Sequence, residues 1–180
     1  GLAHRLLRLH WREAGLPETF QILDADDQQR LVKRVIADLG LDDAKYTARQ
    51  GTWFINNWKD EGKRPRDIDA GANHELSRWL EVYQAYQAAC ERQGLVDFAE
   101  LLLRSHELWL NQPALLDHYQ RRFSHLLVDE FQDTNTIQYA WIRMLAGRSA
   151  QVFAVGDDDQ SIYGWRGAQV ANMQAYTRDF

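Results

Sequence analysis

Two short apolar runs, each followed by acidic residues, constrain the fold of this chain more than any other feature. The first run, 126–128, leads directly into Asp129 and Glu130, and the second, 152–155, leads into another acidic loop. The residues between the runs repeat apolar side chains at the spacing of an amphipathic helix. This order predicts two buried parallel strands with both acidic loops at one sheet edge. Ligands bind at that edge in open α/β sheets, so the pattern indicates half of a nucleotide site.

The first 120 residues are predicted to be almost entirely helical. Asp24 is a favourable N-cap, and Thr47 with Gln50 has the spacing of a capping box. Gly94 follows a long helical pattern and is placed to end it. The expected helices cover residues 2–11, 24–39, 47–62, 74–93 and 97–111, and another begins at Pro113.

From residue 124 the pattern changes to short apolar strands and glycine-containing loops. We therefore place a boundary near 120–123, between segments 1–120 and 121–180. The predicted fold class is mostly α with a small α/β part. Hydrophobic residues make up 45% of the chain and charged residues 26%, which is the composition of a globular domain rather than a disordered segment.

The composition also bears on location and partners. A single cysteine, Cys90, excludes an internal disulfide and suits a reducing compartment, so we expect a cytoplasmic protein. No apolar run approaches the roughly 20 residues that span a bilayer, and no membrane is expected as a partner. A net charge of −5 gives no general attraction to phosphate groups.

Basic residues nevertheless cluster in one short segment. This cluster either contacts duplex DNA or forms a solvated helix end in which Asp60 and Glu61 are interspersed. Its members are Lys59, Lys63, Arg64 and Arg66.

The acidic segments resemble motifs of superfamily 1 DNA helicases of the UvrD/Rep/PcrA group. Residues 128–134, VDEFQDT, resemble the Walker B segment, motif II. Residues 156–168, GDDDQSIYGWRGA, resemble motif III, and the helical stretch that includes 94–102 fits as well. The resemblance covers essentially the whole chain. It implies that 1–120 is a helical insert in the first motor domain and that 121–180 is part of a RecA-like parallel sheet of the P-loop NTPase fold.

The resemblance also implies roles in ATP hydrolysis. Asp129 would bind magnesium through a water molecule, and Glu130 would orient and deprotonate the attacking water. Gln160 would contact the γ-phosphate. The alternative for Asp129 and Glu130 is a loop leading to a helix N-terminus, where carboxylates are favourable. The three aspartates at 157–159 are expected in a solvated turn rather than as metal ligands.

Trp165 is the strongest candidate for contact with DNA. It falls on no apolar helical stripe and lies between Gly164 and Gly167, so its indole is free to stack on an unpaired base. Tyr163 could support that stacking, and Arg166 could hold a backbone phosphate. The alternative is that Trp165 packs in the core, as Trp53, Trp79 and Trp141 are expected to do because they fall on apolar helical stripes.

The resemblance implies an enzyme that hydrolyses ATP, translocates on single-stranded DNA and unwinds duplex in repair or replication, from 3′ to 5′. Its partners would be single-stranded DNA, duplex junctions and repair proteins. No Gly-x-x-x-x-Gly-Lys-Ser/Thr phosphate loop occurs in the sequence, so we expect this chain alone to lack ATPase activity. The alternatives are a non-enzymatic DNA-binding or protein-docking module and part of a helicase–nuclease. Unpaired strand edges at 125–128 and 151–155 predict self-association of the isolated chain.

Overall fold

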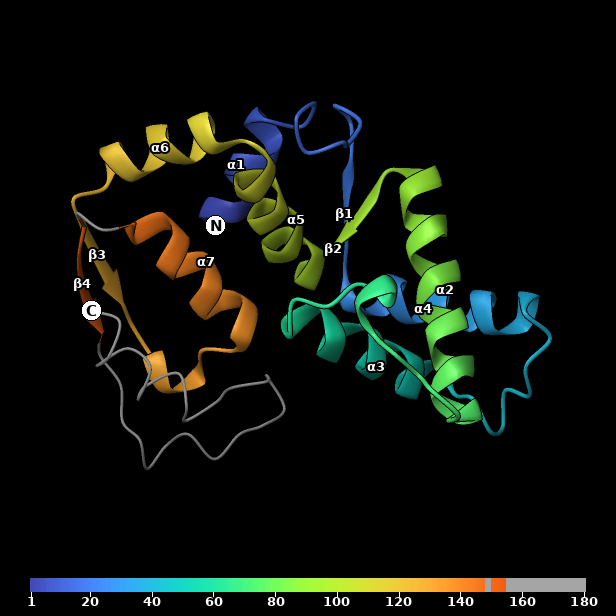
Figure 1. Ribbon diagram of the computed structural model, residues 1–180. Helices are drawn as coiled ribbons and strands as arrows, with labels where there is room; N and C mark the ends of the chain where they lie inside the picture. Colours follow the sequence, from blue (N-terminus) through green and yellow to red (C-terminus); the bar gives the residue numbers. More distant parts are fainter. Residues whose placement is uncertain (148–149, 155–180) are drawn as a thin grey trace. The chain divides into compact units, whose positions relative to one another are not determined.

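The computed structural model describes residues 1–147 and 150–154 (Figure 1). The chain divides into two compact units. The first unit comprises Gly1–Lys59 and Lys63–Leu101, and the second comprises Asp60–Gly62 and Leu102–Phe180. The boundary between the two units thus lies about 20 residues before the change of sequence pattern near 120–123.

The division falls at Leu101 because the last helices before the strands pack within the second unit. In that unit the ring of Trp109 lies 4.8 Å from that of Trp141 and 6.4 Å from that of Tyr119, measured between ring centroids. A change in residue pattern marks where strands begin, whereas a compact unit also includes the helices that cover them.

The first unit is mostly helical, close to the predicted bounds. Three local signals behave as expected: the Asp24 carboxylate accepts the Asp27 N–H at 2.8 Å, Thr47 and Gln50 form the capping box, and Gly94 takes a left-handed conformation with φ of 65°. Its helices are α1 (Leu2–Leu9), α2 (Ala25–Asp38), α3 (Ala48–Asp60) and α4 (His74–Gln93), with the 3₁₀ helix η1 (Pro65–Asp67) between α3 and α4.

A small parallel sheet in the first unit was not predicted. Strand β1 (Gln21–Leu23) pairs with β2 (Leu95–Asp97), and Ile22 lies opposite Val96 (Figure 1). Runs of three residues are too short to show the alternation that marks a strand. Their pairing joins segments far apart in the chain, which local sequence patterns do not report.

The core of the first unit is formed where α2, α3 and α4 pack together. Gly51 allows close approach of α3, because a Cβ there would lie 2.7 Å from Cγ1 of Val32. The fully or nearly fully buried core residues include Leu31, Val32, Val35, Ile36, Phe54, Ile55, Val82, Tyr83, Tyr86, Ala89 and Cys90.

The second unit begins within α5 (Phe98–Asn111) and continues through α6 (Pro113–Arg122). Strand β3 (His125–Val128) is followed by the 3₁₀ helix η2 (Phe131–Asp133), helix α7 (Thr136–Ala146) and strand β4 (Gln151–Ala154). The predicted strand–helix–strand order and the parallel pairing of β3 with β4 are therefore confirmed.

The prediction that these two strands are buried is wrong. Both alternate between exposed and half-buried residues, and Leu127 and Phe153, which lie opposite each other, are 75% and 53% exposed. One face carries Val128 towards Trp141 and Ile142 of α7, and no described helix covers the other face at Leu127 and Phe153. Self-association through these strands stays a prediction.

The predicted fold class is confirmed at the level of a mostly helical chain with small parallel sheets. Among the described residues, no helix is both long and apolar enough to cross a membrane.

Candidate functional site

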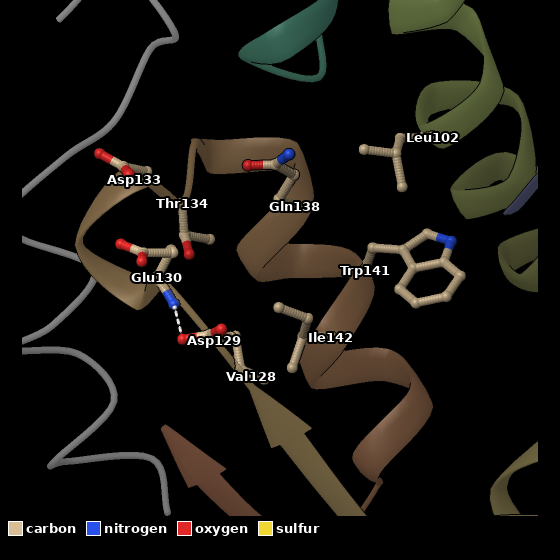
Figure 2. A pocket seen from close by; sticks show the side chains of 9 residues that line it. All are labelled: Leu102, Val128, Asp129, Glu130, Asp133, Thr134, Gln138, Trp141 and Ile142. Carbon is tan, nitrogen blue, oxygen red and sulfur yellow. Dashed lines mark hydrogen bonds between the residues drawn. The ribbon is translucent and has the colours of Figure 1, made fainter. Parts of the chain in front are cut away.

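The end of β3 presents two carboxylates at the carboxyl edge of the parallel pair. Asp129 and Glu130 follow the last strand residue, and both side chains are exposed. Among the described residues other than glycine, only Glu130 has a positive φ, 51°. The Glu130 N–H donates to the Asp129 carboxylate at 2.8 Å, which stabilises this sharp turn (Figure 2). A left-handed conformation costs a residue with a Cβ about 1–2 kcal/mol, and such costs concentrate at functional sites.

A cavity of about 380 Å³ lies beside this turn, with polar groups on one side and apolar groups on the other (Figure 2). The carboxylates of the turn and Thr134 contribute oxygen atoms, whereas Trp141 and Leu102 form an apolar wall. The lining residues are Leu102, Val128, Asp129, Glu130, Asp133, Thr134, Gln138, Trp141 and Ile142, all of the second unit.

The loop between β3 and α7 is held at its far end by a complete capping box. The Asn135 side chain accepts the Gln138 N–H at 2.9 Å, and the Gln138 side chain accepts the Asn135 N–H at 3.0 Å. The Thr136 hydroxyl donates to the Glu61 carboxylate at 3.0 Å. Phe131, in the middle of the loop, is buried. These contacts hold the loop in place, so the positions of the Asp129 and Glu130 carboxylates are well defined.

These oxygen atoms suit a hard cation that keeps most of its water ligands. Within residues 1–147 and 150–154, no group of three or more His, Cys, Asp or Glu side chains is placed to hold a metal ion by itself. Magnesium does not need such a group, since it commonly binds through one or two carboxylates together with water and substrate phosphates. Asp129, with Glu130 beside it, fits that mode of binding.

Comparison with known proteins identifies the family. The model of the UvrD/REP helicase N-terminal domain matches residues 1–180. The chain belongs to the UvrD/REP helicase family.

The chain is 62% identical over 180 residues to DNA helicase II of Escherichia coli strain K12 and to DNA helicase II of Salmonella typhimurium strain LT2. It is 42% identical over 180 residues to the ATP-dependent DNA helicase PcrA of Leuconostoc citreum. The match covers 99–100% of this chain but only 24–25% of each of these relatives. The chain therefore spans about a quarter of their length.

The structure brings together only part of the site that motifs II and III of this helicase family predict. Asp129 and Glu130 lie side by side at the strand end, as the motif II resemblance implies. Gln160, Trp165, Tyr163 and Arg166, together with the aspartates at 157–159, lie outside the described residues.

Three polar residues of the cavity were not predicted as site residues from the sequence. Asp133, Thr134 and Gln138 line the cavity beside Asp129 and Glu130. Asp133 and Thr134 stand within the quoted helicase motif, so their presence in the same segment was the available signal. Gln138 could have been found as the third helical position after Asn135, where a capping box places a Gln.

The basic cluster at residues 59–66 does not form a single exposed patch. Lys59 is fully buried, and its ammonium lies 2.8 Å from Asp97 and 3.0 Å from Glu100. The guanidinium of Arg64, also buried, donates both of its terminal nitrogens to the two oxygens of Glu100 at 2.7 Å. For Lys59 and Arg64, both the duplex contact and the solvated helix end are therefore wrong. The sequence had shown Asp97 and Glu100 only as the start of a helix.

The buried cluster shifts the pKa values of its members. Burial by itself lowers the pKa of Lys59, but the carboxylates of Asp97 and Glu100 outweigh burial and raise it above its ordinary value. Burial raises the pKa of Tyr83 to about 12. It also raises the pKa of Tyr86, whose hydroxyl donates to Asp97 at 2.6 Å. Lys59 is thus held as a cation, and the two tyrosines are held neutral, across the physiological range.

Proposed function

We propose that this chain is part of an ATP-dependent DNA helicase motor. The observation that carries the proposal is the strained turn at the end of a parallel strand, where Asp129 and Glu130 stand beside a cavity of about 380 Å³. Membership of the UvrD/REP helicase family supports it. The relatives named DNA helicase II and ATP-dependent DNA helicase PcrA are about four times as long as this chain, so the activity belongs to the intact protein.

In the proposed motor, segment 121–180 contributes part of a RecA-like sheet and segment 1–120 is the helical insert. The exposed Asp129 carboxylate holds magnesium through water. When bound, the ion would supply positive charge opposite the phosphate oxygens. Glu130 orients the attacking water and takes up its proton, which requires the position at the strand end that the left-handed turn provides.

Motif III supplies the remaining proposed contacts. Gln160 contacts the γ-phosphate of ATP. Trp165 stacks on an unpaired base with support from Tyr163, and Arg166 holds a phosphate of the strand. The substrate is single-stranded DNA at a duplex junction, with translocation from 3′ to 5′ in repair. We propose a cytoplasmic location, because the relatives are bacterial proteins and bacterial DNA lies in the cytoplasm.

The test is ATP hydrolysis by the intact protein with and without single-stranded DNA. Changing Glu130 to Gln keeps the size of the side chain and removes its ability to accept a proton. We expect DNA-stimulated turnover to fall by about 10²–10⁴-fold, the usual contribution of a general base. Binding of ATP, measured separately, is expected to persist because Asp129 remains.

The matched control is Glu18→Gln, which makes the same chemical change at an exposed position of the first unit. This control is expected to keep full turnover. Turnover that survives in Glu130→Gln would place the base elsewhere. If the intact unsubstituted protein hydrolyses no ATP, a non-enzymatic DNA-binding module becomes the better description.

A further inference from the structure

Helix α3 carries a row of exposed and half-buried side chains that the proposed motor does not use. Arg49, Trp53 and Asn57 follow one another at intervals of four residues, which places them on one face of the helix. The expectation that Trp53 packs in the core is wrong: its side chain is 63% exposed, and its indole has no aromatic ring partner among the described residues. A single exposed aromatic side chain is common on protein surfaces, so it is the cavity beside this indole that indicates a ligand.

The exposed indole borders a cavity of about 470 Å³ whose walls are aromatic. Its volume lies within the range of about 300–1,000 Å³ that small ligands occupy. We name this site, lined by Arg49, Gln50, Trp53, Phe54 and Trp79, the aromatic patch; all five residues belong to the first unit.

The far wall of the aromatic patch is fixed by packing. The ring of Trp79 lies 5.1 Å from the ring of Tyr46 in an edge-to-face arrangement and 6.0 Å from that of Phe54 in a stacked one, measured between centroids. Trp79 also packs close to Gly51, where a Cβ would come within 3.3 Å of its ring. A flat ligand would therefore meet a preformed surface at little cost in side-chain ordering.

The polar groups at the rim of the aromatic patch favour an anionic ligand. Arg49 is exposed, and among the described residues it forms no ion pair. The first turn of α3 contains no acidic residue. The Gln50 amide oxygen is already engaged by Thr47, which leaves the amide nitrogen of Gln50 as the group that can meet a ligand. One cation and one donor beside a flat aromatic surface match a nucleobase with its phosphate.

We propose that the aromatic patch binds single-stranded nucleic acid, with an unpaired base stacked on Trp53 and a backbone phosphate held by Arg49. The inference rests on the proposed function, because it takes the strand on which the motor acts as the ligand. It adds a strand contact on the first unit, separate from the residues of motif III.

A protein partner fits the aromatic patch less well. A helix that docks in a groove needs several apolar anchors spaced along its length. Here Trp53 is the one large hydrophobic side chain of the described α3 that is exposed, and its neighbours in the row are a cation and an amide. An aromatic surface beside a cation is instead the arrangement that stacks bases without regard to sequence.

The test measures binding of a fluorescent oligothymidylate to the intact protein without nucleotide, over a range of salt concentrations. We expect Trp53→Ala to weaken binding by about 5- to 150-fold, the range that corresponds to loss of one stacked base. Trp53→Phe should lose less, because a ring remains. Arg49→Gln should lower the slope of log Kobs against log salt by about 0.7, the value for one phosphate contact on a single strand.

Matched measurements separate this proposal from its rivals. Phe98→Ala removes another exposed aromatic side chain and should leave affinity unchanged. The series is repeated in a Trp165→Ala background, so that a strong contact at motif III does not hide the aromatic patch. Melting temperatures check that each variant folds.

The proposal would be overturned if Trp53→Ala left the affinity for oligothymidylate unchanged and Arg49→Gln left its salt dependence unchanged, both with Trp165 intact and in the Trp165→Ala variant. A protein partner would then be the better ligand for the aromatic patch. An equal loss in Phe98→Ala, or a loss confined to a blunt duplex probe, would overturn the proposal as well. ATP hydrolysis is scored separately with Glu130→Gln. A motor that hydrolyses ATP but binds oligothymidylate without Trp53 refutes this inference and leaves the proposed function standing.

Discussion

Asp97 holds the buried charges of the first unit together. Its side chain, at the end of β2, accepts the Lys59 ammonium at 2.8 Å and the Tyr86 hydroxyl at 2.6 Å, and it also caps α5 by accepting the Glu100 N–H at 2.7 Å. Burying a carboxylate is costly unless each of its oxygens is paired. Asp97 meets this condition because α3, α4 and α5 each supply a hydrogen-bond donor, from Lys59, Tyr86 and Glu100.

Replacement of Lys59 by Met tests this buried pairing. The change leaves Asp97 and Glu100 in the core without the cation that lies between them. We expect the free energy of unfolding to fall by about 3–5 kcal/mol, the usual cost of removing one partner of a buried pair. The measurement is urea unfolding followed by circular dichroism. Lys33→Met, at an exposed position of α2, is the control and should change stability by less than about 0.5 kcal/mol.

At the scale of elements, the start of α7 fixes the loop that carries the candidate site. The capping box of Asn135 and Gln138 satisfies backbone N–H groups at the helix N-terminus. The neighbouring Thr136 hydroxyl bonds to Glu61, a residue that belongs to the second unit although it follows α3 in the chain. Disturbing this cap should therefore alter the loop as well as the helix.

Two asparagine caps in the chain permit a matched comparison. Asn135 caps α7 and Asn73 caps α4, each accepting a backbone N–H at 2.9–3.0 Å. Changing either to Ala should lower stability by about 1 kcal/mol. We expect only Asn135→Ala to lower ATP turnover in the intact protein, because only that cap adjoins Asp129 and Glu130. Equal turnover in the two variants would show that the loop holds its geometry without its cap.

At the scale of the whole molecule, the titratable groups buried in the first unit respond in one direction to alkaline pH. Burial raises the pKa of the Cys90 thiol from 9.0 to about 12 and that of the Tyr83 phenol from 10.0 to about 12. The pKa of Lys59 is also raised, by its carboxylate partners. The folded chain therefore keeps protons that the unfolded chain has already released in this range.

This difference in proton binding predicts a loss of stability between about pH 9 and pH 12. Stability falls with rising pH wherever the folded state holds more protons than the unfolded state, by up to about 1.4 kcal/mol per pH unit for each such group. The measurement is the urea midpoint at a series of pH values. Cys90→Ala removes one of these groups, so its stability should fall less steeply from pH 9 upward. A midpoint that is constant up to pH 12 would contradict the prediction.

The sequence by itself determined the features that depend on near neighbours. Helix ends such as Asp24 and Gly94 were predictable because caps and left-handed turns act over a few residues. The same is true of the strand–helix–strand order around α7. Motif II could also be recognised from the sequence, since Asp129 and Glu130 are adjacent in the chain. The family that this motif indicated is confirmed.

Only the tertiary structure decided which groups far apart in the chain meet. Pairing of β1 with β2 and burial of Lys59 against Asp97 both join segments that local patterns cannot relate. The cavity beside Glu130 and the aromatic patch around Trp53 likewise depend on how whole elements pack. From sequence alone, a lysine or arginine is expected to be solvated. Its burial cannot be predicted, because the free energy of a charge is set by its surroundings in the folded protein and not by its position in the chain.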